Sequence, residues 1–499
     1  MNKCCEKCGN SKGERGKSAN AKKILFVGAE VMPFAATGGL GDVLGSLPAA
    51  LNERGNGGVE VRVVMPLHGA VGDRWRQEMK DVYQKTVRLA WRQQYCGVKS
   101  LEKDGVTYYF IDNEYYYNRP SLYGYPDDGE RYAFFCMAAL DLIKETGFYP
   151  DVLHAHDWQA ALSVVYLNAF FRSIPLYAKI RTVFTIHNIA YQGIYDAGTL
   201  WDVFALPEEM RQVMEHGGAI DLMKGAIELC DRLSTVSPRY AEEIRTGEYS
   251  HGLHEVLRRN AHKTCGILNG IDYRYYDPAR DRSIAVSYTS EDLRGKAFCK
   301  EALQRECGLE DRADVPVVAI VSRLVAHKGI DLVSEIAHRL LSSTDIQFVV
   351  LGIGDKRYED LFRALEASFP HRVRALIEYD RDRSKRIYAG ADIFLMPSKS
   401  EPCGLAQMIA SRYGAVPVTR ETGGLFDSIK CYAEKDGDVT GNGFTFSSYS
   451  SASLDSALRA AIDLYGKREK WARLVKRAME TDFSWTVSAE GYLSMYEDL

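Results

Sequence analysis

Charged residues gather in this sequence where buried strands end and helices begin. Arg323 and Lys328 follow the apolar residues 317–321, and Glu401 follows the apolar residues 391–396. A helix start offers unpaired backbone N–H groups and the positive end of a dipole, while a guanidinium and an ammonium bind phosphate oxygens. These residue types predict a binding site for a diphosphate, in which Glu401 can accept hydrogen bonds from a hydroxyl-rich part of the same ligand.

Glycine-rich loops follow two other predicted strands. Residues 37–42 come after the strand predicted at 23–28, and residues 422–425 come after the strand predicted at 415–419. Glycine lets a backbone approach a phosphate or a sugar with no side chain between them. Either loop alone is equally well explained as an ordinary helix cap. Their position at the same sheet edges as the charged residues favours a binding site.

A histidine occupies the equivalent position after a third strand. His187 directly follows the apolar residues 182–186, and Asp157 follows the strand predicted at 151–155. Active sites of α/β proteins keep their polar groups at the carboxyl ends of parallel strands, so we expect His187 in the site rather than in the core. We expect Asp157 to cap the helix that begins beside it.

The order of elements predicts the fold class. Strands and helices alternate from about residue 23 and again from residue 317, with a polar, turn-rich stretch between the two runs and a hairpin at 86–113 that turns at 103–105. This pattern indicates an α/β protein with two Rossmann-like, doubly wound domains facing across a cleft, and a C-terminal helix that crosses back to the first domain. The predicted limits are 1–22 for a disordered polar tail, 23–265 and 266–480 for the domains, and 481–499 for the final helix.

Composition excludes several classes of function. The chain of 499 residues has 46% hydrophobic and 26% charged residues and a formal net charge of −4, so its surface as a whole attracts neither nucleic acid nor anionic lipid. The sequence shows neither a signal peptide nor an apolar run long enough to span a membrane. Eleven scattered cysteines are typical of reduced thiols, and we expect a cytoplasmic protein. Cys4, Cys5 and Cys8 lack a second pair nearby, so no zinc site is expected there.

Seven collinear motifs carry a resemblance. From about residue 23 to residue 496 the chain resembles the bacterial glycogen synthase and plant starch synthase family, and it shares the FSW signature at 483–485. The motifs are TGGLGD at 37–42, HDW at 156–158, HNIAYQG at 187–193, NGID at 269–272, SRL at 322–324 followed by Lys328 and Gly329, EPCGL at 401–405, and TGGL at 422–425.

The resemblance implies a GT-B fold and an activity. Members of the family transfer glucose from ADP-glucose to the non-reducing end of an α-1,4-glucan with retention of configuration, and they need no metal or other cofactor. By resemblance, Arg323 and Lys328 bind the diphosphate, Glu401 holds glucose hydroxyls, His187 contacts the sugar near the reacting carbon, and Asp157 and Asn269 position the donor. The other expected substrate-binding residues are Gly38, Gly39, Asp42, Tyr123, Asn188, Gly354, Cys403, Gly404, Leu405, Thr422, Gly423 and Gly424.

Retention has two chemical explanations. A covalent carboxylate nucleophile is one, and attack on the same face guided by the leaving phosphate is the other. The sequence shows no paired carboxylates at glycosidase-like spacing, which favours the second. The motif Asp380-Arg381-Asp382 matches a metal-binding DxD only in its letters, because it precedes a basic helix instead of ending a strand.

One position departs from the family pattern. The first glycine loop of the family commonly begins with a lysine that contacts the donor, and here that position is Ala36. Losing a charge-assisted contact costs about 1.5–3 kcal/mol. The chain is then a weaker synthase, a synthase with the charge supplied from elsewhere, or a glucan-binding homologue without turnover. A GT-B transferase that uses UDP-glucose is a further alternative.

Overall fold

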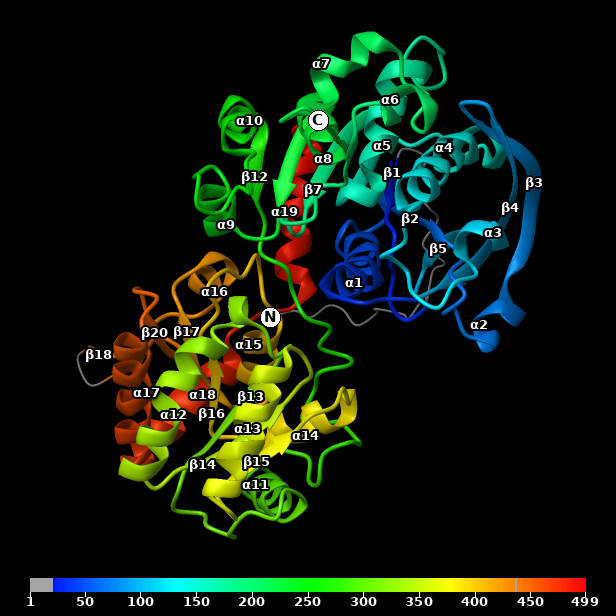
Figure 1. Ribbon diagram of the computed structural model, residues 1–499. Coiled ribbons are helices and arrows are strands. Elements are labelled where there is room, and N and C mark those ends of the chain that lie inside the picture. The colour runs from blue at the N-terminus through cyan, green and yellow to red at the C-terminus, as the bar shows by residue number, and fades with distance from the viewer. Residues whose placement is uncertain (1–20, 436–437) are drawn as a thin grey trace, which may run out of the picture.

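The protein consists of two lobes, each an α/β unit built on its own sheet (Figure 1). The computed structural model describes residues 21–435 and 438–499. Residues 1–20, with most of the predicted polar tail and its three cysteines, lie outside the described residues, and Lys22 already belongs to the first strand. The domain limits given above stay predictions.

The first lobe contains a nine-stranded sheet in the order β12-β11-β7-β6-β1-β2-β5-β4-β3. Its central strands are parallel and almost wholly buried, which explains their continuous apolar sequence. The last three strands are antiparallel, and the predicted turn at 103–105 is confirmed. The strands are β1 (Lys22–Val27), β2 (Val59–Pro66), β3 (Lys80–Leu89), β4 (Arg92–Lys103), β5 (Val106–Asp112), β6 (Val152–His156), β7 (Arg181–Ile186), β11 (Arg232–Thr235) and β12 (Thr264–Gly266).

Helices cover both faces of this sheet. Helices α4 and α5 pack on each other, and 13 of the 19 residues of α4 and all nine of α5 are buried, so the two helices form the interior of the lobe. A small sheet was not predicted, and it consists of β8 (Ile194–Asp196), β10 (Ala219–Asp221) and β9 (Glu215–His216) in that order. The helices that bear on the site are α1 (Gly39–Arg54), α4 (Asp128–Thr146), α5 (Trp158–Tyr166), α8 (Leu222–Leu229) and α9 (Pro238–Glu243).

The second lobe contains a wholly parallel six-stranded sheet in the order β15-β14-β13-β16-β17-β20. Two of its strands, β13 (Val317–Val321) and β16 (Ile393–Met396), have the predicted bounds. The other elements are β14 (Gln347–Leu351), β15 (Val373–Leu376), β17 (Val416–Arg420), β20 (Phe444–Phe446), α11 (Arg294–Glu306), α12 (Ile330–Ser343), α13 (Lys356–Ser368), α14 (Arg381–Gly390), α15 (Ala406–Arg412), α16 (Gly423–Ser428), α17 (Ser451–Tyr465) and α18 (Arg468–Glu480).

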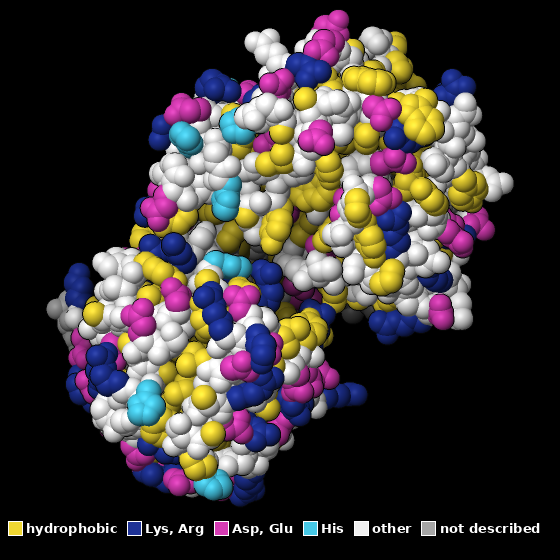
Figure 2. Space-filling view, viewed as in Figure 1, with side chains coloured by type: hydrophobic (Ala, Val, Ile, Leu, Met, Phe, Trp, Pro, Cys, Tyr) yellow, Lys and Arg dark blue, Asp and Glu magenta, His cyan; other side chains and the backbone are white. Residues whose placement is uncertain are grey.

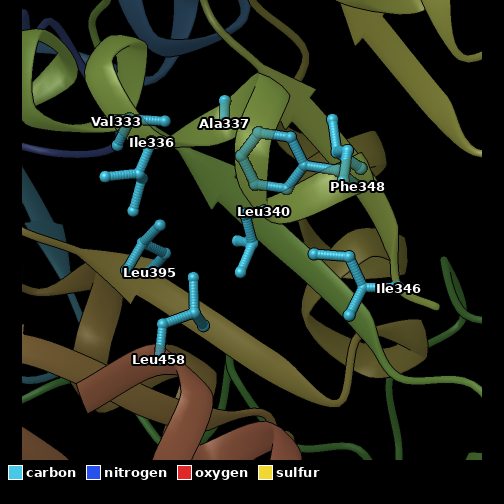
Figure 3. A pocket seen from close by; sticks show the side chains of 9 residues that line it. Val333, Ile336, Ala337, Leu340, Ile346, Phe348, Leu395 and Leu458 are labelled. Carbon is cyan, nitrogen blue, oxygen red and sulfur yellow. The ribbon is translucent and has the colours of Figure 1, made fainter. Parts of the chain in front are cut away.

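A small apolar pocket lies within the second lobe, between α12, α17 and the sheet (Figure 3). All of its side chains are hydrocarbon, so it offers no polar group to orient a ligand, and it is a packing defect of the core. The lining residues are Val333, Ile336, Ala337, Leu340, Leu341, Ile346, Phe348, Leu395 and Leu458.

The last helix, α19 (Trp485–Glu497), packs against α1 in the first lobe, as predicted (Figure 1). Its buried face includes Trp485, Tyr492 and Tyr496, which belong to the same core cluster as strands β1 and β2. None of the helices in the described part of the chain combines the length and the apolar character needed to cross a membrane.

The packing of α19 predicts the effect of one substitution. Trp485→Ala removes a side chain that is 6% exposed, and we expect the free energy of unfolding to fall by about 3–5 kcal/mol. Val487 on the same helix is 51% exposed, so Val487→Ala is the matched control and should change stability by less than about 0.5 kcal/mol. Chemical denaturation measures both values, and equal effects of the two substitutions would contradict this packing.

Candidate active site

The loops that carry the predicted residues lie where the two lobes meet. Helix α9 of the first lobe packs on α16 of the second, and Arg381 at the start of α14 pairs with Asp42 on α1 at 3.5 Å. The surface is hollowed between the lobes (Figure 2). The carboxyl ends of strands from both sheets therefore contribute to one interdomain region, as expected for a ligand site.

A buried carboxylate organises the first glycine loop. Glu30 is 4% exposed and accepts hydrogen bonds from the amides of Thr37 and Gly38 and from the hydroxyl of Tyr123 at 2.7 Å. Glu30 was not among the residues predicted from the sequence, although it lies just past the end of β1, the same signal that selected His187. Tyr123 thus holds the loop through Glu30, and Gly39 is exposed at its tip.

Asp42 follows this loop in the first turn of α1. The pKa of its carboxyl is raised to about 6, mainly by burial and to a smaller extent by Glu30, while the Arg381 guanidinium acts to lower it. Arg381 comes from the DxD-like motif, whose first acid, Asp380, caps α14 by accepting a hydrogen bond from the Arg383 amide at 2.9 Å. The motif therefore supplies a helix cap and an interdomain ion pair.

Asp157 does not cap α5, and this expectation was wrong. Its backbone has a φ of 57°, and its side chain makes no hydrogen bond to that helix. Instead, its Oδ1 accepts the amides of His187 at 2.7 Å and Asn188 at 3.4 Å, so it fixes the loop after β7. Burial raises the pKa of Asp157 to about 7, although the two amide bonds act to lower it.

The His187 ring lies beside a second histidine. Its Nε2 is 3.0 Å from Nδ1 of His156, and the residue is 8% exposed. Burial lowers the pKa of His187 to about 3, so its imidazole is neutral at physiological pH and can form only uncharged hydrogen bonds. The neighbouring Asn188 turns its side-chain oxygen to the Ala190 amide at 3.0 Å, which closes the loop.

In the second lobe, the predicted cation and carboxylate are in contact. The Lys328 ammonium lies 2.6 Å from Oε2 of Glu401, which also accepts the Ser398 hydroxyl at 3.0 Å. Arg323 is exposed at the end of β13. Gly354 forms a backbone bridge with Leu324, so the glycine lets two strand-end loops lie together.

The turn between Glu401 and α15 depends on a glycine. Gly404 has a φ of +71°, a conformation that other residues adopt only under strain. Burial raises the pKa of the Cys403 thiol to about 12, so it stays protonated, and the Asn269 amide hydrogen-bonds to its sulfur. The side-chain oxygen of Asn269 is buried and has no hydrogen-bond partner in the described part of the chain. Leu405 directly precedes the first residue of α15.

A second carboxylate organises the loop before α16. Glu243 on α9 accepts the Gly423 amide at 3.0 Å and the Thr422 hydroxyl at 3.1 Å, and the Gly424 amide donates to the Glu401 carbonyl at 3.2 Å. In this conformation, the amides expected for a phosphate are therefore bonded to protein acceptors. Glu243 was not among the residues predicted from the sequence, and it lies 180 residues from Gly423.

The contact between α9 and α16 is reciprocal. Asp427 on α16 accepts the Ser237 hydroxyl at 2.5 Å and the Arg239 amide at 2.9 Å, both at the start of α9. Each helix thus receives a carboxylate of the other at its N-terminal end, where the helix dipole favours negative charge. These hydrogen bonds stabilise the observed position of the two lobes relative to each other.

The structure places the predicted residues in two groups that these contacts join. The first lobe supplies Gly38, Gly39, Asp42, Tyr123, Asp157, His187 and Asn188, and the second supplies Arg323, Lys328, Gly354, Glu401, Cys403, Gly404, Leu405, Thr422, Gly423 and Gly424, with Asn269 on the connection between them.

Comparisons with known proteins define the class. Residues 23–259 match a model described as the starch synthase catalytic domain, and residues 309–478 match glycosyl transferases group 1. A sucrose-phosphate synthase from Thermosynechococcus elongatus superposes with a TM-score of 0.59 at 16% identity, which shows the fold alone. The chain is a glycosyltransferase with the GT-B fold, and the predicted fold class is confirmed.

Closer relatives identify the family. The chain is 44% identical over 479 residues to a glycogen synthase of Bacillus subtilis, with 96% of this chain and 98% of the relative covered. A solved catalytic domain of starch synthase IV from Arabidopsis thaliana, bound to ADP and acarbose, has a TM-score of 0.87 at 34% identity and covers 96% of this chain and 99% of that one. The chain belongs to the glycogen synthase and starch synthase family, and the resemblance in its motifs is confirmed.

The raised pKa of Asp157 predicts a pH effect on stability. A carboxyl with a higher pKa in the folded state destabilises the fold as pH rises through the interval between the unfolded and folded values. Asp157→Asn keeps an acceptor for the His187 amide and removes this titration. The stability of the variant relative to the natural protein should therefore increase by about 2–3 kcal/mol from about pH 5 to about pH 8. Thermal unfolding at several pH values measures the difference, and a constant difference would contradict the raised pKa.

Proposed function

We propose that this chain transfers glucose from ADP-glucose to the non-reducing end of an α-1,4-glucan with retention of configuration. The observation that carries the proposal is the Lys328–Glu401 pair at the sheet edge of the second lobe. It occurs in a chain 34% identical to a plant starch synthase domain whose structure was solved with ADP and acarbose bound. A cation for a diphosphate thus lies beside an acceptor for sugar hydroxyls.

The chemistry of the reaction suits these groups. Breaking the bond between the sugar and the phosphate builds negative charge on the diphosphate and positive charge on the sugar carbon. Lys328 and Arg323 would stabilise the leaving diphosphate, Glu401 would accept hydrogen bonds from glucose hydroxyls, and neutral His187 would hydrogen-bond to the sugar. Glu401 already holds Lys328 and Ser398, which favours a binding role over a nucleophile and hence attack on the same face.

A donor assay tests the proposal. Purified protein mixed with ADP-glucose and glycogen should release ADP and lengthen the glucan, and Glu401→Ala should reduce the rate by at least about a hundredfold. Release of UDP from UDP-glucose at an equal or higher rate would identify the other donor. Absence of transfer from both donors would contradict the proposed activity.

A second candidate is a glucan-binding homologue with weak or no turnover, and Ala36 is the observation that favours it. Ala36 packs its Cβ against Gly41 at the start of α1, next to the loop that Glu30 holds. The methyl side chain of Ala36 carries no positive charge for the donor.

A cytoplasmic location of the protein stays a prediction.

Restoring the lysine separates these alternatives. Ala36→Lys adds a cation beside the donor phosphates, so we expect a higher transfer rate or a lower KM for ADP-glucose by about ten- to a hundredfold. Steady-state kinetics measure both constants, with Ala36→Met as the control for side-chain length. Unchanged kinetics would show that position 36 does not limit transfer.

A further inference from the structure

A row of buried side chains runs from the C-terminal helix to the active-site loop. The hydroxyl of Tyr496 on α19 lies 2.7 Å from Nδ1 of His154, and the His154 ring stacks on His156 with centroids 4.1 Å apart. His156 in turn holds Nε2 of His187 through its Nδ1 at 3.0 Å. Tyr496, which is 342 residues from His154 in the sequence, is thereby connected to the predicted sugar-binding residue His187.

The His154 ring is fixed on both sides. Its Nε2 lies 2.6 Å from the Thr185 hydroxyl, which lies 2.5 Å from the Ser234 hydroxyl. Tyr496 is the partner of the other ring nitrogen. All of these groups are buried, so water cannot replace a lost partner without a rearrangement of the core.

The His156 ring makes a single hydrogen bond within the described part of the chain. Its Nε2 is buried without a hydrogen-bond partner in the described part of the chain, so the bond to His187 is the only one the ring makes. Its orientation therefore depends on packing between His154 and Phe26, whose ring centroid is 4.8 Å from each histidine. A displacement of the His154 ring would therefore move His156 and change the geometry of its hydrogen bond to His187.

The same pattern assigns a tautomer to His187. Buried N–H groups are left without acceptors more rarely than acceptors are left without donors. His156 then carries its proton on Nδ1 and donates it to Nε2 of His187, which places the His187 proton on Nδ1. Nδ1 is the nitrogen of His187 that is not closed off by the protein, so it offers a donor to an oxygen of the ligand.

We propose that Tyr496 is a positioning residue for His187 and acts through His154 and His156. The proposal deepens the proposed function, because it assigns a role in transfer to the helix that crosses back from the second lobe. Tyr496 is 1% exposed within the core beside β1 and α1, so it cannot contact a ligand directly. Its hydroxyl keeps the histidine row in the geometry in which His187 presents Nδ1–H.

Two phenylalanine substitutions on one helix test the proposal. Tyr496→Phe removes the hydroxyl that His154 needs. Tyr492→Phe is the matched control, because Tyr492 is equally buried on α19 and its hydroxyl has no partner in the described residues. We expect Tyr496→Phe to lower kcat about five- to tenfold with KM for ADP-glucose changed less than about twofold, and Tyr492→Phe to leave both constants within about twofold. Equal kcat values in the two variants would overturn the proposal.

A second readout does not require turnover. Long-range ¹H–¹⁵N spectra of protein labelled on its histidines report the tautomer of each ring, with His156→Gln and His187→Gln used for assignment. We expect the His187 signals to show a proton on Nδ1 in the natural protein and in Tyr492→Phe, and to shift or broaden in Tyr496→Phe. Identical His187 signals in all three proteins would also overturn the proposal, whereas an inactive natural protein with the expected spectra would contradict only the proposed function.

Discussion

Buried backbone amides at loop ends and helix starts must have acceptors, and in this protein carboxylates supply them at four places around the site. Glu30 takes the amides of the first glycine loop, and Asp157 takes those of the loop after β7. Glu243 and Asp427 take amides across the boundary between the lobes. The positions of the loops, and of the two lobes relative to each other, depend on these bonds.

The same bonds shape the glycine loop at the start of α16. A carboxylate that accepts the Gly423 amide and the Thr422 hydroxyl occupies a position suited to an anion, so the loop is already shaped for one. Under the proposed function, a diphosphate that takes the Gly423 amide would have to displace Glu243. Donor binding would then be linked to the contact between α9 and α16, because both would use one N–H group.

Sequence patterns were sufficient where the information is local. The strand at 317–321 is an apolar run with polar ends, and Glu401 with its glycine was found because it directly follows a strand. The expected role of Asp157 was wrong because the sequence pattern of an acid before a helix does not show which amides its carboxylate accepts. Those amides can belong to that helix or, as here, to the loop after β7. Glu243 could not be found, since its partner lies 180 residues away and only the packing of two domains brings them together.

The C-terminal helix has a consequence for synthesis of the chain. A ribosome makes the strands and helices of the first lobe well before the 13 residues of α19, yet Trp485, Tyr492 and Tyr496 complete the core beside β1 and α1. Until those residues emerge, a nascent chain exposes the apolar surface that they cover. The domain that is made first is thus the one that finishes folding last.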